Sequence, residues 1–362
     1  MKHGWEYKKL GEVASYINGY AFKPEQWKED GTPIVRIQNL NNPNAPYNYY
    51  DGEVPEKVII NNGDLLISWS ASLGAYIWQG GRAFLNQHIF KVCLDKTDID
   101  KMYLKYAVTS KLDAMAGQVH GATMKHIVKK DFDNTKIPYP PTNIQQSIVS
   151  ELDKINELIR LKKEQLKDYD NLAQSIFYEM FGDPAVNDKN WKVMKLGEIC
   201  RNCDNLRKPI TASDRIPGSI PYYGASGIVD YVEDYIFSSD YLLVSEDGAN
   251  LLARTTPIAF SISGKTWVNN HAHVLEFKDS ETQLYVEYLI NSVDISNYIT
   301  GAVQPKLNQA KLNVFPIPLP PHSLQQLFAQ RIELIKQQKA EIQSTIQDLE
   351  TLLASRMQYW FD

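Results

Sequence analysis

The distribution of apolar and polar residues divides the chain into segments of two kinds. Residues 2–139 contain short runs rich in β-branched and aromatic residues, and clusters of Asn, Gly and Pro separate these runs. We expect strands at 33–37, 64–69 and 88–92, and a helix near 102–109. This part of the sequence therefore predicts a mixed α+β domain.

The next segment has the spacing of a long helix. Its apolar residues recur at intervals of four and three, which is the heptad pattern of a coiled coil. At about 1.5 Å per residue, the stretch 144–181 would form a rod roughly 57 Å long, and Gly182 is placed to end it. A second segment with this pattern begins near residue 324, and Lys162 and Lys339 interrupt the two patterns near their middles. The apolar positions are Ile148, Leu152, Ile155, Ile159, Leu166, Tyr169, Ala173 and Ile176 in the first segment, and Phe328, Ile332, Ile335, Ile342, Ile346, Leu349 and Leu353 in the second.

Both helical segments follow an Ile-Pro-x-Pro-Pro tract, at 137–141 and at 317–321. Proline pushes the residue before it into an extended conformation, so each helix should start after its tract. We expect Asn143 and Ser323 as the N-caps, each in a capping-box arrangement with the Gln three residues further on.

The Pro-Pro tract belongs to a repeat that spans the chain. A Trp-x-x-x-x-Leu-Gly-Glu-Val/Ile element at 5–13 returns at 191–199, and strand-like and helix-like runs recur in the same order between each element and the following tract. Two copies of a unit this long indicate a pseudo-dimeric duplication rather than a solenoid. The predicted divisions are a first α+β domain at 1–140, a first helix at 141–183, a second α+β domain at 184–320 and a second helix at 321–362.

The length and the apolar pattern of the two helical segments favour an antiparallel helix pair that acts as a spacer between the two domains. Ten-turn helices with a narrow apolar seam exceed what one small domain usually covers. The alternative is that each helix packs only on its own domain.

Composition limits the classes of protein to which the chain can belong. The formal net charge is −5, with 38 basic and 43 acidic residues, so nonspecific attraction to nucleic acid should be weak unless a partner adds positive charge. The three cysteines form no disulfide framework, and the first residues show no apolar signal region, so we expect a reduced, cytoplasmic protein. No apolar run reaches the roughly 18 residues that a membrane span needs, so no membrane association is expected.

Several motifs that resemble enzyme or metal sites do not fit those sites. Gly264-Lys265-Thr266 resembles the end of a phosphate-binding loop, but Ala259 stands where the first glycine is required. Cys200 and Cys203 have metal-like spacing, but no second pair of ligands follows, so free thiols are the better interpretation. His271 and His273 are interpreted as surface or core histidines.

Polar loops next to the predicted strands are better candidates for function. Asn and Gln amides can bind adenine through two hydrogen bonds, and Arg can bind guanine in the same way. The turns at 121–127 and 301–307 could bind phosphate through glycine N–H groups and a lysine, and the alternative is that they are purely structural. The framework agrees between the copies and the loops differ, which suits two different half-sites. The expected DNA-binding residues are Arg36, Gln38, Asn39, Trp69, Ser70, Arg82, Asn86, Gln87 and Lys125 in the first copy, and Arg201, Arg207, Asn250, Arg254, Asn269, Asn270 and Lys306 in the second.

With these motifs assembled, the chain resembles the DNA-specificity (S) subunits of type I restriction-modification systems over essentially its full length. In that family each half opens with the Trp-x-x-x-x-Leu-Gly-Glu element and ends with a Gly-Ala-Thr-like turn, an Ile-Pro-x-Pro-Pro tract and a Gln-led long helix. The family usually has Glu before that Gln, whereas this chain has Ile144 and Leu324.

The resemblance implies two tandem target recognition domains, each followed by a long helix, with the two helices paired as an antiparallel coiled coil around a pseudo-two-fold axis. It implies a noncatalytic subunit that binds a bipartite double-stranded DNA sequence and docks two modification (methyltransferase) subunits. The resemblance also implies restriction or motor subunits as further partners. S-adenosylmethionine, ATP and Mg would be bound by those partner subunits, and none of these cofactors by this chain.

Two other classes of protein stay in competition with this interpretation. A fused single-chain nuclease or methyltransferase would need a cofactor motif, and the sequence offers none that fits. A coiled-coil scaffold that binds only proteins would agree with the acidic balance but would leave the Asn, Gln and Arg-rich loops unexplained.

Overall fold

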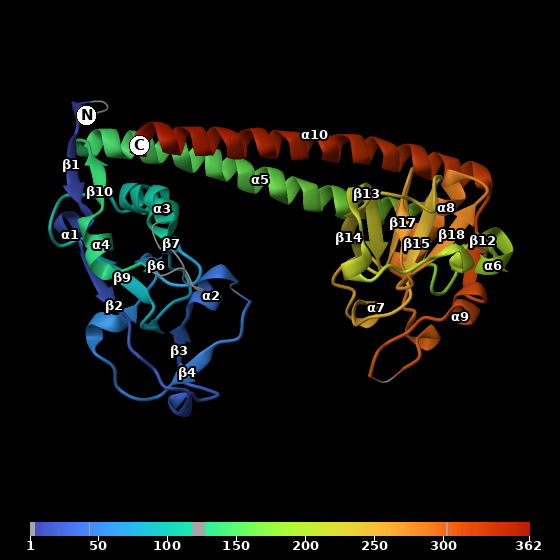
Figure 1. Cartoon of the computed structure of the whole chain (residues 1–362), viewed down its shortest axis with the longest axis horizontal. Coiled ribbons are helices and arrows are strands. Elements are labelled where there is room, and N and C mark those ends of the chain that lie inside the picture. Colours follow the sequence, from blue (N-terminus) through green and yellow to red (C-terminus); the bar gives the residue numbers. More distant parts are fainter. Residues whose placement is uncertain (1–3, 43, 118–126, 302) are drawn as a thin grey trace. The chain divides into compact units, whose positions relative to one another are not determined.

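The structure is a computed structural model that describes residues 4–42, 44–117, 127–301 and 303–362 (Figure 1). The chain forms two compact units. Unit 1 consists of Met1–Lys162 together with Thr345–Asp362, and unit 2 consists of Lys163–Ser344. Each unit therefore combines one globular α+β part with segments of both long helices.

Unit 1 is built on two four-stranded sheets among its described residues. The first sheet has the strand order β2-β9-β6-β7 and is antiparallel throughout. The second has the order β4-β3-β8-β5, in which β3 and β8 run parallel. The sheet strands are β2 (Ser15–Asn18), β3 (Thr32–Val35), β4 (Asn48–Tyr50), β5 (Ile59–Ile60), β6 (Leu65–Ser68), β7 (Gly74–Ile77), β8 (Ala83–Leu85) and β9 (Ile89–Cys93).

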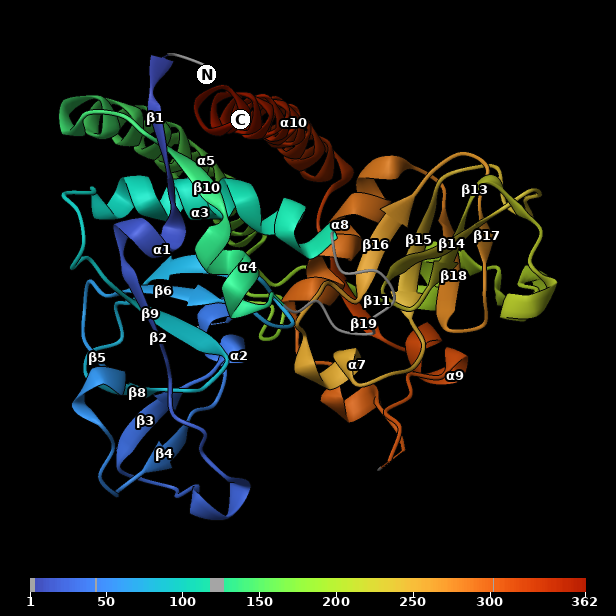
Figure 2. The same ribbon diagram turned by 60° about the vertical axis from the view of Figure 1, so that its left-hand side comes forward.

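A two-stranded ribbon connects the sheets of unit 1 to the first long helix. Strand β1 (Glu6–Lys9) pairs antiparallel with β10 (Lys136–Tyr139), which contains the first residues of the Pro-Pro tract. Figure 2 shows this ribbon beside α1 (Leu10–Val13), α3 (Lys101–Gly117) and α4 (Lys129–Asn134). The globular part of unit 1 also contains α2 (Ile37–Asn41), which lies nearer the sheets.

Unit 2 repeats this plan with one strand fewer. Its ribbon is β11-β19, its first sheet has the order β12-β18-β15-β16, and its second sheet has three strands in the order β14-β13-β17. The strands are β11 (Lys192–Lys195), β12 (Cys200–Asn202), β13 (Pro217–Gly224), β14 (Gly227–Val232), β15 (Tyr241–Ser245), β16 (Ala259–Ile262), β17 (Trp267–Val268), β18 (Ala272–Phe277) and β19 (Pro316–Leu319). The helices of the globular part are α6 (Leu196–Ile199), α7 (Asn250–Ala253), α8 (Ser280–Ser292) and α9 (Gln309–Asn313).

The long helices α5 (Thr142–Phe181) and α10 (His322–Phe361) pair in opposite directions. In unit 1 the first half of α5 meets the last turns of α10, where Glu151 accepts hydrogen bonds from Arg356. In unit 2 the second half of α5 meets the first half of α10, where Asp170 binds Lys339. The apolar positions predicted for the seam include Ile148, Leu152, Phe328 and Ile332, and these side chains are buried. The predicted antiparallel coiled coil is confirmed.

The start of each long helix differs from the prediction. Helix α5 begins at Thr142, so Asn143 lies inside the helix and is not its N-cap. The decisive side chain is Gln145, which is fully buried and donates a hydrogen bond to the Pro140 carbonyl oxygen at 2.9 Å. Its oxygen accepts a hydrogen bond from the Asp100 N–H at 2.8 Å. The Pro-Pro tract and the globular part therefore fix the helix start, and a capping box is not needed.

Helix α10 begins at His322 rather than after Ser323, and its glutamine makes only part of the equivalent contacts. Gln325 donates to the Pro320 carbonyl oxygen at 2.8 Å, but its side-chain oxygen is buried without a hydrogen-bond partner within the described residues. The residues where this chain departs from the usual family pattern, Ile144 and Leu324, are partly buried and pack against the cores of units 1 and 2 respectively. Apolar side chains that pack against a core therefore stand at the two positions where S subunits usually have Glu.

Aromatic side chains anchor each Pro-Pro tract and each helix end to a core. Tyr103 of α3 donates to the Pro138 carbonyl oxygen at 2.9 Å, and Tyr285 of α8 donates to the Pro318 carbonyl oxygen. Phe361 is fully buried in the core of unit 1, and Phe181 lies in the core of unit 2. Gly182 follows α5 with a φ of +78°, as expected for a glycine that ends a helix.

Candidate nucleic-acid interface

In unit 1, several predicted residues gather where strands β3, β6 and β8 end. The Trp69 N–H donates to the His88 carbonyl oxygen, and the Asn86 N–H donates to the Val35 carbonyl oxygen. Trp69 packs its ring against Phe90 and His88, with ring centroids 5.7 and 5.5 Å apart. The structure therefore brings Trp69, Ser70, Asn86 and Gln87 to one loop end of the unit.

The Gln87 side-chain oxygen and Nδ1 of His88 lie at this loop end, are shielded from solvent and have no hydrogen-bond partner within the described residues. A buried acceptor without a donor costs on the order of 1–3 kcal/mol. Ser70 and Asn86 are each 9% exposed, so they support the turn more than they face solvent.

Arg36, Gln38 and Asn39 follow β3 directly, but they differ in role. The Asn39 side chain is 2% exposed, accepts a hydrogen bond from the Arg36 N–H and donates to the Ala45 and Pro46 carbonyl oxygens. It therefore ties Arg36 to Ala45 and Pro46 and does not face a ligand. Arg36 donates to the Asn48 side chain at 3.1 Å and lies over the Trp27 ring, whereas Gln38 is exposed.

The remaining two predictions in unit 1 lie apart from this loop end. Arg82 precedes β8, at the opposite end of that strand from Asn86, and its exposed guanidinium lies over the Phe84 ring. Lys125 lies outside the described residues, as do residues 121–126 of the predicted phosphate-binding turn at 121–127.

In unit 2 the same loop end is held together by backbone hydrogen bonds. The Glu246 N–H donates to the His271 carbonyl oxygen, and the Leu307 N–H donates to the Glu246 carbonyl oxygen. These bonds repeat those of unit 1, where Trp69 N–H donates to His88 and Ile127 N–H donates to Trp69. Glu246 therefore occupies the position that Trp69 occupies in the first copy.

The side chains at this position form an ion network in unit 2. His273 is fully buried, with Nδ1 2.6 Å from an Asp204 carboxylate oxygen and Nε2 2.7 Å from the Leu307 carbonyl oxygen. Both ring nitrogens therefore face oxygen atoms that can accept a hydrogen bond. Arg207 donates to Glu246 at 2.7 Å, and Lys306 lies 3.1 Å from the other oxygen of Glu246.

The network keeps its carboxylates ionised. Burial alone would raise the pKa of Asp204, but the hydrogen bond and charge of His273, the Val274 N–H and Arg207 together lower it below its ordinary value. Burial likewise opposes ionisation of Glu246, and Arg207, His273 and Lys306 lower its pKa. Asp204, Glu246 and His273 could form a metal-binding group by distance. The two cations already neutralise the carboxylates, so the cluster is a structural ion network.

This network gives Arg207 and Lys306 internal partners. The Arg207 side chain is 13% exposed and also donates to the Ala272 carbonyl oxygen, so it joins the loop end to β18. Lys306 keeps about half of its side chain exposed. Lys306 is thus the one of the two that presents charge to solvent.

Four further residues of unit 2 that were predicted to bind DNA have hydrogen-bond or ion-pair partners within the unit. Arg254 donates to the Ile290 and Val293 carbonyl oxygens, and Asn250 binds the Thr255 hydroxyl and the Thr256 N–H, so both hold the α7 loop. Asn269 is 8% exposed and accepts from the His271 N–H at 2.8 Å. Arg201 pairs with Glu276 toward the far end of β18 from the loop end.

Asn270 is exposed beside His271, and the structure reveals residues here that sequence reasoning did not select. His271 is half exposed and lies 2.9 Å from the Asp247 carboxylate, while His273 two residues later is buried. The only sequence signal was the pair of histidines next to the Asn-rich turn. Their partners, Asp204, Glu246 and Asp247, are distant in sequence and could not be chosen from it.

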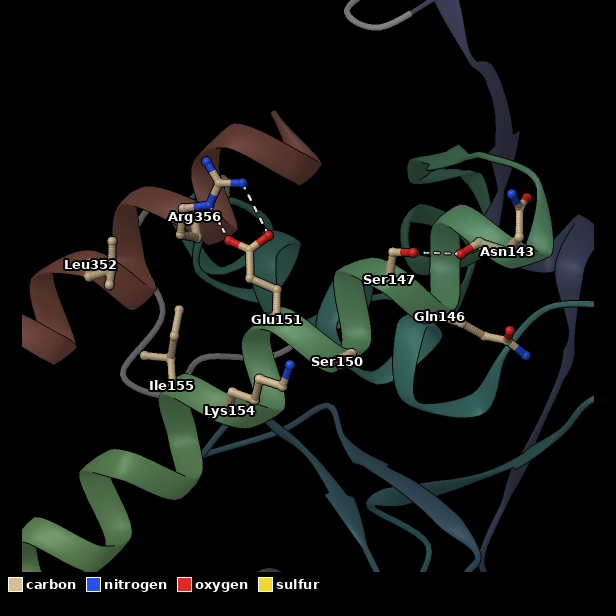
Figure 3. Close-up of a pocket in the computed structure, with 9 residues that line it drawn as sticks. All are labelled: Asn143, Gln146, Ser147, Ser150, Glu151, Lys154, Ile155, Leu352 and Arg356. Carbon is tan, nitrogen blue, oxygen red and sulfur yellow. Dashed lines mark hydrogen bonds and ion pairs between the residues drawn. The ribbon is translucent and has the colours of Figure 1, made fainter.

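A groove lies between the long helices in unit 1 (Figure 3). Its volume is about 690 Å³, and Figure 3 shows Glu151 and Arg356 bonded across it. A second groove of about 750 Å³ lies on an adjacent face of α5 and is lined by Gln146, Asp153 and Leu158, among others.

Unit 2 has a groove at the repeat-related position of α10. Its volume is about 880 Å³, and its lining includes Gln326 and Glu333, which are the repeat equivalents of Gln146 and Asp153. The chain therefore carries two repeat-related grooves, one along α5 in unit 1 and one along α10 in unit 2. Within the described residues, no helix is both long and apolar enough to cross a membrane, and the three cysteines are free thiols.

Comparison with known proteins gives a consistent result. The family model of the type I restriction modification DNA specificity domain matches residues 2–168 and 188–351. A predicted type I restriction enzyme specificity subunit of Haemophilus influenzae is 37% identical over 139 residues, which cover 38% of this chain and 35% of the relative. The chain thus spans about a third of that relative's length.

Two matches extend over nearly the whole chain. The type I restriction enzyme MjaVIII specificity subunit of Methanocaldococcus jannaschii is 23% identical over 412 residues, covering 96% of this chain and 92% of the relative. The crystal structure of a type I restriction-modification S subunit from M. genitalium has a TM-score of 0.56 at 15% identity, covering 99% of this chain and 96% of that one. The structural likeness concerns the fold.

Proposed function

The chain belongs to the family of the type I restriction modification DNA specificity domain, and we propose that it is the subunit that directs methylation and cleavage to a bipartite DNA sequence. Each recognition domain reads one half of that sequence. The chain itself is noncatalytic in this proposal, and S-adenosylmethionine, ATP and Mg are bound by partner subunits.

One observation carries the proposal. The two units share their strand order and the hydrogen bonds of their loop ends, yet the chemistry there differs. The first loop end carries an aromatic cluster around Trp69, whereas the second carries the ion network around Glu246. A constant frame with different loop chemistry suits two readers of two different half-sites. The boundaries proposed for the readers are 1–140 and 184–320, with spacer helices at 141–183 and 321–362.

We propose a smaller set of base-reading residues than the full set of polar loop residues. The exposed Gln38 and Asn270 and the partly exposed Arg36 keep amide or guanidinium groups near the loop ends, although Gln38 also donates to the Pro46 carbonyl oxygen. Gln87 is partly exposed there, with its side-chain oxygen shielded from solvent. Lys306 is the proposed phosphate contact, because its ammonium is half exposed. Asn39, Asn250, Arg254 and Arg207 are assigned to holding the loops in place.

Single substitutions should change one half-site and leave the other intact. With Gln87→Ala, preference at one position of one half-site is expected to fall roughly tenfold, since one good base contact contributes about 1–3 kcal/mol of discrimination. Asn270→Ala should do the same to the other half-site. The measurement is single-base mapping of N6-methyladenine after co-expression with the modification subunit. Changes in both halves from one substitution would contradict the modular assignment.

We further propose that two modification subunits dock on the repeat-related grooves of α5 and α10. The two grooves share their position in the repeat, with Gln146 and Asp153 in one and Gln326 and Glu333 in the other. A surface that occurs twice suits two copies of one partner. Restriction or motor subunits would join the complex that forms.

Filling one groove should remove one modification subunit. Ser150→Trp in the first groove and Gln330→Trp in the second are each expected to weaken binding at that groove at least tenfold, because a bulky ring blocks close packing. Native mass spectrometry of the complex then shows one modification subunit in place of two. Ser175→Trp, at an exposed α5 residue, is the control. Loss of both subunits from either single change would argue against two independent grooves.

A further inference from the structure

His271 is a half-exposed imidazole whose other polar groups are already bound. Its N–H donates to the Asn269 side-chain oxygen at 2.8 Å, and its carbonyl oxygen accepts from the Glu246 N–H at 2.8 Å. The ring atom Nδ1 lies 2.9 Å from both oxygens of Asp247. Within the described residues no hydrogen bond is made by Nε2, so this atom alone is left for a ligand.

Asp247 determines which way the ring points. Its carboxylate is 14% exposed and binds Nδ1 through two short contacts, so the ring cannot rotate without losing them. The backbone of Asp247 is itself held, because its segment pairs with Lys306 in an isolated bridge. Such preorganisation is typical of side chains that bind a partner with a defined geometry, since little entropy is lost on binding.

The repeat places this imidazole at the loop end that faces the proposed half-site. His271 corresponds to His88, because each carbonyl oxygen accepts the N–H of the residue at the equivalent strand end, Glu246 or Trp69. The exposed Asn270 and the half-exposed Lys306 lie on the same loop end. Ser70 stands where Asp247 stands in unit 2, so the carboxylate-held imidazole is particular to the second domain.

The charges around the ring favour a base rather than a phosphate as its ligand. The Asp247 carboxylate lies directly against the ring, so negative charge accompanies the imidazole, whereas the neighbouring Glu246 is paired with Arg207 and Lys306. The Asp247 carboxylate disfavours a phosphate at the ring, and the half-exposed Lys306 ammonium is the better phosphate contact at this loop end. A base edge carries hydrogen-bonding atoms without net charge.

We propose that His271 reads a base of the second half-site through Nε2, and that Asp247 is its positioning residue. This inference rests on the function proposed above and deepens it. Neither residue is among those selected from the sequence.

The test uses the complete complex formed with the modification subunit. N6-methyladenine is mapped at single-base resolution in cells that express the parent chain or one of three variants, His271→Ala, Asp247→Asn and His322→Ala. His322 is the matched control, since it is also 49% exposed and also pairs with a carboxylate, that of Asp279, but at the start of α10. The parent should give a bipartite motif with a fixed gap.

His271→Ala is expected to lower base preference roughly ten- to hundredfold at one position of one half-site, with the other half unchanged. Asp247→Asn should affect the same position more weakly, and His322→Ala should leave the motif as in the parent. An unchanged motif for His271→Ala, or a uniform fall of methylation at every sequence, would overturn the role of His271. A parent complex that gives no motif would instead contradict the proposed function itself.

Discussion

Asp204→Asn is expected to destabilise unit 2 by about 3–5 kcal/mol, because removing one partner of a buried ion pair leaves the other charge uncompensated. The Asp204 side chain is 7% exposed and contacts the fully buried ring of His273. It also accepts the Val274 N–H at 2.8 Å, so the substitution weakens a backbone anchor as well. Denaturant unfolding of the full chain, with hydrogen exchange to locate the change, measures the effect.

Two comparisons separate this effect from a general loss of charge. Asp230→Asn removes an ion pair with Arg215 that is far more exposed, so stability should hardly change. The pH dependence provides the second comparison. Since the pKa of Asp204 in the folded chain is below 3.8, its contribution is complete above that pH and is lost as the pH falls through the folded value. The difference between parent and variant should therefore shrink only in acid, and a difference independent of pH would contradict the ion-pair explanation.

Phe361→Ala should destabilise unit 1 by about 3–5 kcal/mol, the range observed when a buried aromatic side chain is removed and leaves a cavity. Phe361 is fully buried, and its ring centroid lies 5.4 Å from that of Tyr103. Tyr103 also binds the Pro138 carbonyl oxygen, so the same cluster holds the end of α10 and the Pro-Pro tract. Thermal or denaturant unfolding gives the size of the loss.

The repeat supplies the matched controls for this prediction. Phe181→Ala removes the equivalent ring from unit 2, which is 2% exposed, and should cost a similar amount there. Gln358→Ala lies on the exposed side of the same turn of α10 as Phe361 and should have little effect. Hydrogen exchange should assign each loss to its own unit. Loss of protection in unit 2 from Phe361→Ala would show that the two cores are not independent.

The sequence alone was sufficient to predict the repeat, the heptad seams of the long helices and the α+β class of the two domains. These features depend on local spacing, which the chain carries directly: apolar residues at intervals of three and four predict a buried helix stripe wherever the helix packs. The seam residues Ile148, Leu152, Phe328 and Ile332 are buried as that spacing required. The strand at 64–69 and the helix near 102–109 appear as β6 and α3 for the same reason.

The starts of the two long helices are not determined by the local sequence alone. A capping box at Asn143 is a reasonable local prediction, but the Gln145 side chain finds partners in Pro140 and Asp100, the second of which is distant in sequence. A buried amide must be satisfied by whatever the fold brings near it. The start of α5 is therefore held in part by a contact, that of Gln145 with the Asp100 N–H, which only the tertiary structure brings together.

The roles of the polar loop residues were decided only by the tertiary structure. Asn39, Arg207 and Arg254 have the residue types of base readers, yet the fold turns them inward onto carbonyl oxygens and carboxylates. Whether a polar side chain faces a ligand or the interior depends on its burial and partners, and the partners here are up to tens of residues away.

The same holds for the histidines of the second domain. The sequence shows two histidines separated by one residue, but the fold buries His273 against Asp204 and leaves His271 half exposed against Asp247. Strand alternation puts residues two apart on the same face, but His271 lies just before β18 and outside that alternation, so only the packing around each histidine determines which one is covered. Local spacing thus determined the elements and their repeat, while long-range packing determined which side chains remain available to bind DNA.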